Sequence, residues 1–288
     1  MANLKGHKMA KTKAVAKVEE KKNTSLAVSQ ELPDYLTGRE NMGTEALGKG
    51  DFKIPRIKLL QSNSPEVRSF QGKALPSQFW HTGANKDLGS EFLFVPAIVS
   101  KRVIVWRPRD DNDGGILAFS RDGVKWDSGA NQEFSVKLKN IKNPVKWRTG
   151  KNVQDSGLLD FGTSNPDEPQ SAPAATLAYE YMAFLLAHPE DSPTILGVMK
   201  TGVGNARQLN TYLLSQRKPT SCMVIRCFSD EEQGNGNTWF VPKFEPAGYA
   251  SKEVFQIAEN IKEKYQDYVA DIDLDEETTS KPIDEVAY

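Results

Sequence analysis

Hydrophobic positions in the middle of the chain come in short runs that end at polar turns, which is the pattern of β-strands. The runs are rich in Val, Ile and Phe, and Gly, Asp and Asn separate them. We expect residues 92–99 and 102–107 to form two strands joined by Ser100 and Lys101. Shorter strands are predicted at residues 56–61, 116–120, 124–127, 134–138 and 144–148.

The second half of the chain continues this pattern after an interruption. Residues 155–175 are rich in Pro, Ser, Asp and Gly and predict a long loop, either a mobile flap or a linker. The mostly apolar residues 176–187 predict a strand in the middle of a sheet, and residues 194–200 predict another. Residues 222–228 and 238–244 flank Gly-Asn-Gly-Asn and predict a hairpin.

Helical spacing of apolar residues is clear at two places. Leu209 and Leu213 share a face within residues 205–216, and Pro219 follows that segment. A second helix is expected after Ser251, which can cap its N-terminus. With about eight to ten strands and no alternation of strands with helices, the chain is predicted to be mainly β (α+β). We expect an antiparallel barrel or sandwich with two short helices.

Charge divides the chain into three parts. Residues 1–22 carry seven lysines and two glutamates, a net charge of +5, whereas residues 266–288 carry eight acids and one lysine, a net charge of −7. Between them stand 29 basic and 28 acidic side chains. We therefore predict a disordered basic tail at residues 1–33, a folded body at 34–265 and an acidic tail at 266–288.

Few residues are suited to catalysis or metal binding. The three histidines, His7, His81 and His188, are scattered along the chain, and Cys222 and Cys227 would lie on opposite faces of a strand. We expect free thiols and hence a reducing, cytoplasmic compartment. No run is long and apolar enough for a signal peptide or a membrane helix, so no membrane partner is predicted.

Two loops carry residues that resemble ligand-binding motifs but depart from them. Gly202 and Gly204 precede a predicted helix, yet Arg207 stands where a dinucleotide motif has its third glycine. The turn at 110–115 holds three aspartates, but Arg121 replaces the glutamate of a calcium loop. We predict no catalytic residue, no metal and no cofactor. A two-metal nuclease stays open, because such sites assemble from distant segments.

Basic residues interleaved with aromatic ones give the chain three possible nucleic-acid surfaces. Such surfaces bind single strands, since cations follow the phosphates while bases stack on rings. The alternative is a solvated edge strand whose lysines prevent aggregation. The first group is Lys137, Lys139, Lys142, Lys146, Trp147 and Arg148; the second is Lys101, Arg102, Trp106 and Arg107; the third is Arg226, Trp239 and Lys243.

The end of the chain, residues 269–288, is acidic, carries Pro-Ile-Asp and closes on Tyr288. It resembles the tails of tailed-phage and bacterial single-stranded DNA-binding proteins. That resemblance implies an OB-fold barrel that binds DNA and a tail tip, Asp284, Glu285 and Tyr288, that recruits replication or recombination proteins. The family usually ends on Phe and is shorter, so the role of residues 50–175 stays open.

Taken together, these patterns predict a non-catalytic protein that binds single-stranded DNA in phage replication or recombination, in the cytoplasm of the bacterial host. The acidic tail is expected to regulate binding and to recruit partners, and a homo-oligomer is left open. Two alternatives remain: a phage structural or accessory assembly protein, and a metal-dependent nuclease or recombination enzyme.

Overall fold

The computed structural model describes residue 43 and residues 53–70, 72–108, 111, 114–139, 141–234 and 236–266. The chain divides into two units, Met1–Gly48 and Lys49–Tyr288, and every element described below belongs to the second. The predicted basic tail and residues 267–288 of the predicted acidic tail lie outside the described residues.

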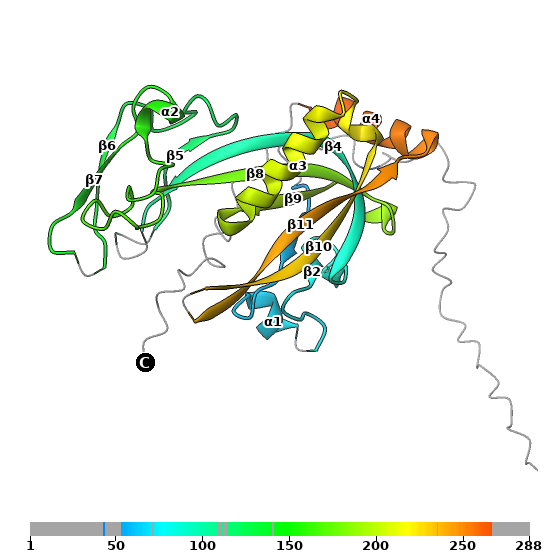
Figure 1. Ribbon diagram of the computed structural model, residues 1–288, viewed down its shortest axis with the longest axis horizontal. Coiled ribbons are helices and arrows are strands. Elements are labelled where there is room, and N and C mark those ends of the chain that lie inside the picture. The colour runs from blue at the N-terminus through cyan, green and yellow to red at the C-terminus, as the bar shows by residue number, and fades with distance from the viewer. Residues whose placement is uncertain are drawn as a thin grey trace, which may run out of the picture. The chain divides into compact units, whose positions relative to one another are not determined.

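The dominant feature of the second unit is a large curled sheet, which forms half of a barrel (Figure 1). Its strand order is β11-β10-β4-β8-β9-β1-β2-β3, and β5 pairs with β4 beside this path. All pairs are antiparallel except β1 with β9. The mainly β, largely antiparallel prediction is thus confirmed. The strands are β1 Arg56–Leu59, β2 Phe79–His81, β3 Lys86–Asp87, β4 Glu91–Trp106, β5 Ile116–Ser120, β8 Ala175–Leu185, β9 Thr194–Met199, β10 Met223–Gly234 and β11 Asn237–Tyr249.

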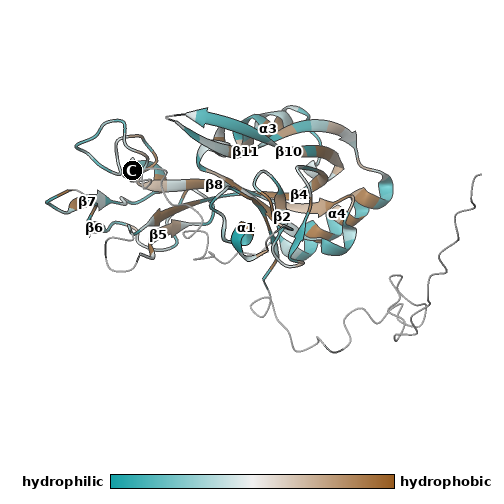
Figure 2. Ribbon diagram, turned by 90° about the horizontal axis from the view of Figure 1, so that it is seen from below, coloured by the Kyte–Doolittle hydropathy of each residue, from teal (hydrophilic) through white to brown (hydrophobic). Residues whose placement is uncertain are grey.

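Two helices cover opposite faces of this sheet. Side chains of successive strand residues point to alternate faces, and in β8 Tyr181 and Ala183 pack with Leu209 of α3 (Val203–Ser215). The intervening Met182 packs with Ala258 of α4 (Lys252–Tyr265). In Figure 2 the ribbon of α4 carries both hydrophilic and hydrophobic residues, as expected of a helix with one buried face. Because both of its faces are buried, β8 has the long apolar sequence from which a central strand was predicted.

The prediction of two strands joined at Ser100 and Lys101 is wrong, because this segment forms the single strand β4. Residues 92–99 and 102–107 do not form two strands, since β4 runs unbroken through Ser100 and Lys101. These two residues pair with Glu180 and Tyr179 of β8. Neither Ser nor Lys favours the left-handed conformations of a tight hairpin, and pairing along the whole of β8 keeps the backbone extended. The irregularity lies instead at Pro96, where the register with β8 shifts and no amide hydrogen is available.

The two sides of the curled sheet are joined by side-chain amides. Gln61 follows β1, and its Nε2 donates to the Phe240 carbonyl while its Oε1 accepts from the Phe240 amide, both at 2.9 Å. Asn205 Nδ2 donates to the carbonyl of Pro242 at 3.0 Å. The Gln61 amide thus makes the two hydrogen bonds that a neighbouring strand would make, and Pro242 has no amide hydrogen to leave unsatisfied.

A second hydrophobic core lies at the far ends of β4 and β8 (Figure 1). We call residues 107–174 the distal lobe. It contains β5, the two-stranded sheet of β6 (Glu133–Val136) and β7 (Val145–Arg148), and the short helix α2 (Val153–Ser156). Trp126 and Trp147 fill its core, and Trp126 Nε1 donates to the Thr149 carbonyl at 2.8 Å.

Two further predictions bear on the distal lobe. No strand forms at residues 124–127, where Asp122 accepts amide hydrogen bonds from Val124 and Lys125 and so closes a turn. The predicted loop before β8 folds back on itself, because Gly162 donates to the Ser171 carbonyl at 2.7 Å.

Both predicted helices are confirmed. The described residues also contain two short helices that were not predicted, α1 (Pro65–Ser69) and α2. Ser251 caps α4 by accepting from the Val254 amide, as its position predicts. Cys222 and Cys227 are both free. Among the described residues, none of the helices is long and apolar enough to cross a membrane.

Candidate nucleic-acid interface

The first predicted group of cations is brought together on the small sheet of the distal lobe. In β7, Val145 and Trp147 are buried and the intervening Lys146 and Arg148 are exposed. In β6, Val136 is buried, and the chain continues into an exposed turn. The buried face holds this sheet on the core of the lobe, so its polar face must point outward. The exposed cations of this surface, which we call the basic hairpin, are Lys137, Lys139, Lys142, Lys146 and Arg148.

One acid lies within the basic hairpin. Glu133 of β6 is opposite Arg148 and accepts from its Nε at 2.6 Å, and it lies 2.7 Å from Lys146 Nζ. Hydrogen bonds from Lys146 and Arg148 lower the pKa of the Glu133 carboxyl. Lys137 and Lys142 have no acidic partner among the described residues. The surface therefore keeps a clear excess of positive charge at neutral pH.

The aromatic side chains are placed differently from the prediction. Trp147 is only 4% exposed and belongs to the core of the lobe, whereas Trp106 and Phe134 are half-buried. Sequence reasoning missed Phe161, which is 76% exposed in the loop before β8. The sequence does contain a signal for this exposed ring, because Phe161 is an isolated aromatic residue in a polar loop with two nearby glycines. A stacking surface here would use Phe161 of the lobe and Trp106 of β4, which pairs with Ile116 of β5, and it cannot use Trp147 without opening the core.

The second predicted group is dispersed. Arg102 is buried and lies 3.0 Å from Glu180, which also accepts from Arg56 Nη2 at 2.6 Å. Arg107 donates to Asp111 at 3.0 Å. The stem of Lys101 lies against Gly123, where an added Cβ would come within 2.2 Å of Lys101 Cε. We therefore leave Arg102, which holds strands together, out of the interface proposed below.

The third group lies on the β10–β11 hairpin, and each of its members is bound to an acid. Arg226 pairs with Glu91 and Glu245, and Lys243 pairs with Asp230. Trp239 Nε1 donates to Glu232 at 3.1 Å. These pairings raise the pKa of Arg226 and of Lys243. The end of β10, with Asp230, Glu231 and Glu232, forms a hydrophilic tip (Figure 2). The predicted tail residues Asp284, Glu285 and Tyr288 lie outside the described residues.

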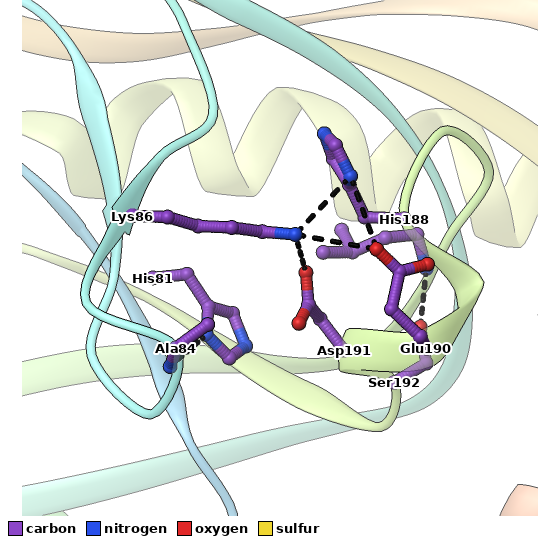
Figure 3. A network of polar contacts seen from close by, with 8 residues as sticks. His81, Ala84, Lys86, His188, Glu190, Asp191 and Ser192 are labelled. Carbon is purple, nitrogen blue, oxygen red and sulfur yellow. Dashed lines mark hydrogen bonds and ion pairs between the residues drawn. The ribbon is translucent and has the colours of Figure 1, made fainter. Parts of the chain in front are cut away.

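A different cluster of functional groups joins the β2–β3 hairpin to the turn between β8 and β9 (Figure 3). Lys86 Nζ contacts Asp191 and lies 3.3 Å from both Glu190 Oε1 and His188 Nδ1. A hydrogen bond from Lys86 to Asp191 is the main reason that the pKa of Lys86 is raised. His188, Glu190 and Asp191 could hold a metal ion, since their donor atoms lie within 4.8 Å of one another.

His81 lies next to this cluster and is 2% exposed. Its Nδ1 accepts from the Ala84 amide at 2.9 Å. Burial lowers the pKa of His81, although the nearby Asp191 acts in the opposite direction. Sequence reasoning treated His81 and His188 as isolated loop residues. Their proximity depends on the pairing of β1 with both β2 and β9, which no local pattern reveals.

The profile of one protein family, described as Pam3 phage gp34-like protein, matches residues 21–269. The chain belongs to this family. The match covers the whole described sheet, both long helices and the distal lobe, so the gp34-like family includes both regions. The phage context of the predicted resemblance is thereby supported, but the family description mentions neither single-stranded DNA nor an OB-fold. No curated protein and no solved structure matches the chain.

Proposed function

We propose that this gp34-like protein binds single-stranded DNA, without catalysis, through the basic hairpin of its distal lobe. The observation that carries the proposal is the gathering of five exposed cations around one acid: Lys146 and Arg148 on the outward face of β7, and Lys137, Lys139 and Lys142 in the segment that joins β6 to β7. Because Val136, Val145 and Trp147 anchor the opposite face in a core, the backbone that carries Lys146 and Arg148 is held in place before binding. Less conformational entropy is then lost on binding.

Attraction to phosphates accounts for most of the expected affinity, and stacking adds to it. Phe161 of the lobe is exposed and Trp106, which pairs with Ile116 of β5, is half-buried, and base stacking on an aromatic ring contributes about 1–3 kcal/mol. We assign the acidic residues 266–288 the role of a competitor for the basic hairpin and of a recruiter of replication or recombination proteins. The proposed setting is the cytoplasm of the phage's bacterial host.

The test is a titration of the protein into labelled oligo-dT at several salt concentrations, with fluorescence anisotropy as the readout. About five phosphate contacts predict a slope near −3.5 for log K against log salt, or about 100-fold weaker binding at 200 mM than at 50 mM salt. The triple variant K137Q/K139Q/K142Q should flatten the slope. The variant K252Q/K262Q/K264Q removes the same charge from α4 and should not. Absence of binding at low salt would refute the proposal.

A second candidate is an accessory protein of phage assembly. It is favoured by the third cationic group, whose members are all bound to acids, and by the acidic hydrophilic tip of β10. Light scattering after size-exclusion chromatography distinguishes the two: a large oligomer that ignores DNA supports assembly. Incubation of labelled DNA with Mg²⁺ or Mn²⁺ would reveal a nuclease.

A further inference from the structure

The cluster shown in Figure 3 has the composition of a metal site and contains a lysine at its centre. His188, Glu190 and Asp191 come from one tight turn, with Glu190 and Asp191 in the single 3₁₀ turn Pro189–Asp191. Lys86 reaches the same point from β3. One imidazole and two carboxylates are ligands suited to borderline divalent ions such as Zn²⁺, and two carboxylates would offset the charge of the ion.

The distances between the donors suit a shared ion. His188 Nδ1 lies 3.4 Å from Glu190 Oε1. Two ligands of a tetrahedral ion with bonds of about 2.1 Å stand about 3.4 Å apart. His188 Nδ1 also lies 3.3 Å from Lys86 Nζ. The ring nitrogen that would bind the ion therefore faces the point where Lys86, Glu190 and Asp191 meet.

One polar atom beside the cluster has unmet hydrogen-bonding capacity. His81 Nε2 is buried and has no hydrogen-bond partner among the described residues. Because the Ala84 amide donates to His81 Nδ1, the neutral ring carries its proton on Nε2. A buried donor without an acceptor is costly, and an oxygen ligand bound at the cluster would provide that acceptor.

We propose that His188 Nδ1, Glu190 and Asp191 bind a divalent transition cation of the Zn²⁺ type, which displaces the ammonium of Lys86. A solvent molecule would complete the coordination. His81 Nε2–H is the positioning group, since it can donate to a ligand oxygen as outer-shell residues of metal sites do. Lys86 then acts as an internal competitor that occupies the site while the metal is absent.

The experiment uses the full chain, with Zn²⁺ measured by calorimetry and Co²⁺ by its tetrahedral visible spectrum. We expect one ion per chain, a raised Tm and no comparable effect of Mg²⁺, which requires octahedral oxygen ligands. K86M should bind Zn²⁺ about fivefold more tightly, because one competing, partly exposed ion pair is gone. That increase is the decisive result, since a cluster held together by Lys86 alone would show no gain.

Ligand variants complete the test. D191N should abolish Zn²⁺ binding, and D167N/E168Q, which removes two exposed acids from a loop of the distal lobe, should bind as the wild type does. If D191N fails to fold, H188Q serves in its place, because the His188 side chain is 37% exposed. The proposal is overturned if wild type and K86M both lack a tetrahedral Co²⁺ spectrum, or if H188Q retains full Zn²⁺ affinity.

Discussion

The body of the sheet and the distal lobe share two strands, β4 and β8, but use their charged residues in opposite ways. In the body, Arg56, Glu180 and Arg102 form a buried ion cluster across the sheet. In the lobe, Lys146 and Arg148 pair with Glu133 at the surface, where water screens them. Helices α3 and α4 cover both faces of the body, whereas the described helix of the lobe has four residues. The charges of the buried cluster therefore serve the structure, whereas those of the basic hairpin remain available to a ligand.

The largest expected effect comes from removing one core ring from each region. Trp147→Ala should destabilise the lobe by about 3–5 kcal/mol, because a buried indole leaves a cavity. We expect hydrogen exchange to rise across β6 and β7 while the body stays protected, and DNA binding to fall. Phe94→Ala, which opens the body core instead, should raise exchange throughout. Equal loss of protection in both regions with Trp147→Ala would show that the lobe has no stability of its own.

Substitutions of Glu180 in the body and Glu133 in the lobe compare a buried ion pair with an exposed one. Glu180→Gln should cost about 3 kcal/mol in urea unfolding, because it removes the carboxylate between two buried arginines. Glu133→Gln should leave the unfolding midpoint almost unchanged, since exposed pairs contribute little. It should also raise the affinity for oligo-dT, because Lys146 and Arg148 are released to bind phosphates. A drop in affinity with Glu133→Gln would contradict the proposed interface.

The amide bridge from Gln61 to Phe240 is expected to have a smaller effect. Gln61→Ala removes two hydrogen bonds, each with a net contribution of about 1 kcal/mol, so we expect a loss of about 2 kcal/mol. Exchange of the Phe240 amide should increase more than that of its neighbours in β11. Unchanged protection of that amide in the variant would mean that water replaces the bridge without cost.

The smallest expected effect is a pH dependence confined to the lobe. Amide hydrogen bonds from Lys125 and Val124 lower the pKa of Asp122 below its usual value. Its stabilising contribution is therefore complete above the unfolded-state pKa of about 3.9 and disappears as the pH falls through the lower folded-state pKa. Thermal unfolding of the lobe between pH 6 and pH 2 should show this loss. Asp122→Asn should remove the part that Asp122 contributes and leave that of Glu133, and identical pH curves for the two proteins would refute it.

The local pattern of the chain was enough for most elements of the sheet and for both long helices. Alternating side chains predicted β7, and Ser251 with the apolar spacing behind it predicted α4. Prediction from the local pattern failed where the backbone conformation depends on pairing with a strand that is distant in the sequence. Ser100 and Lys101 are extended because β8 lies alongside them, and β8 is more than 70 residues away in the chain.

The candidate nucleic-acid interface was also predictable only in the features that depend on local sequence. Alternation placed Lys137 and Lys139 on one face and so indicated an exposed basic surface. The prediction grouped Trp147 with these cations, but in β7 it alternates with Lys146 and Arg148 and its face packs on the core of the lobe.

Residue type and spacing by themselves determined that this chain forms a β-rich domain with a basic surface near residue 140. Only the tertiary structure decided which cations are neutralised and which are free, because ion pairs such as Arg102 with Glu180 join residues that are distant in the chain. It also decided that Lys86 meets His188, Glu190 and Asp191, since the pairing of β1 with β2 and β9 brings β3 near the turn before β9. The physical reason is that the sequence of a strand determines which residues lie on each of its two faces. Which strands pair with it depends on the packing of the whole sheet.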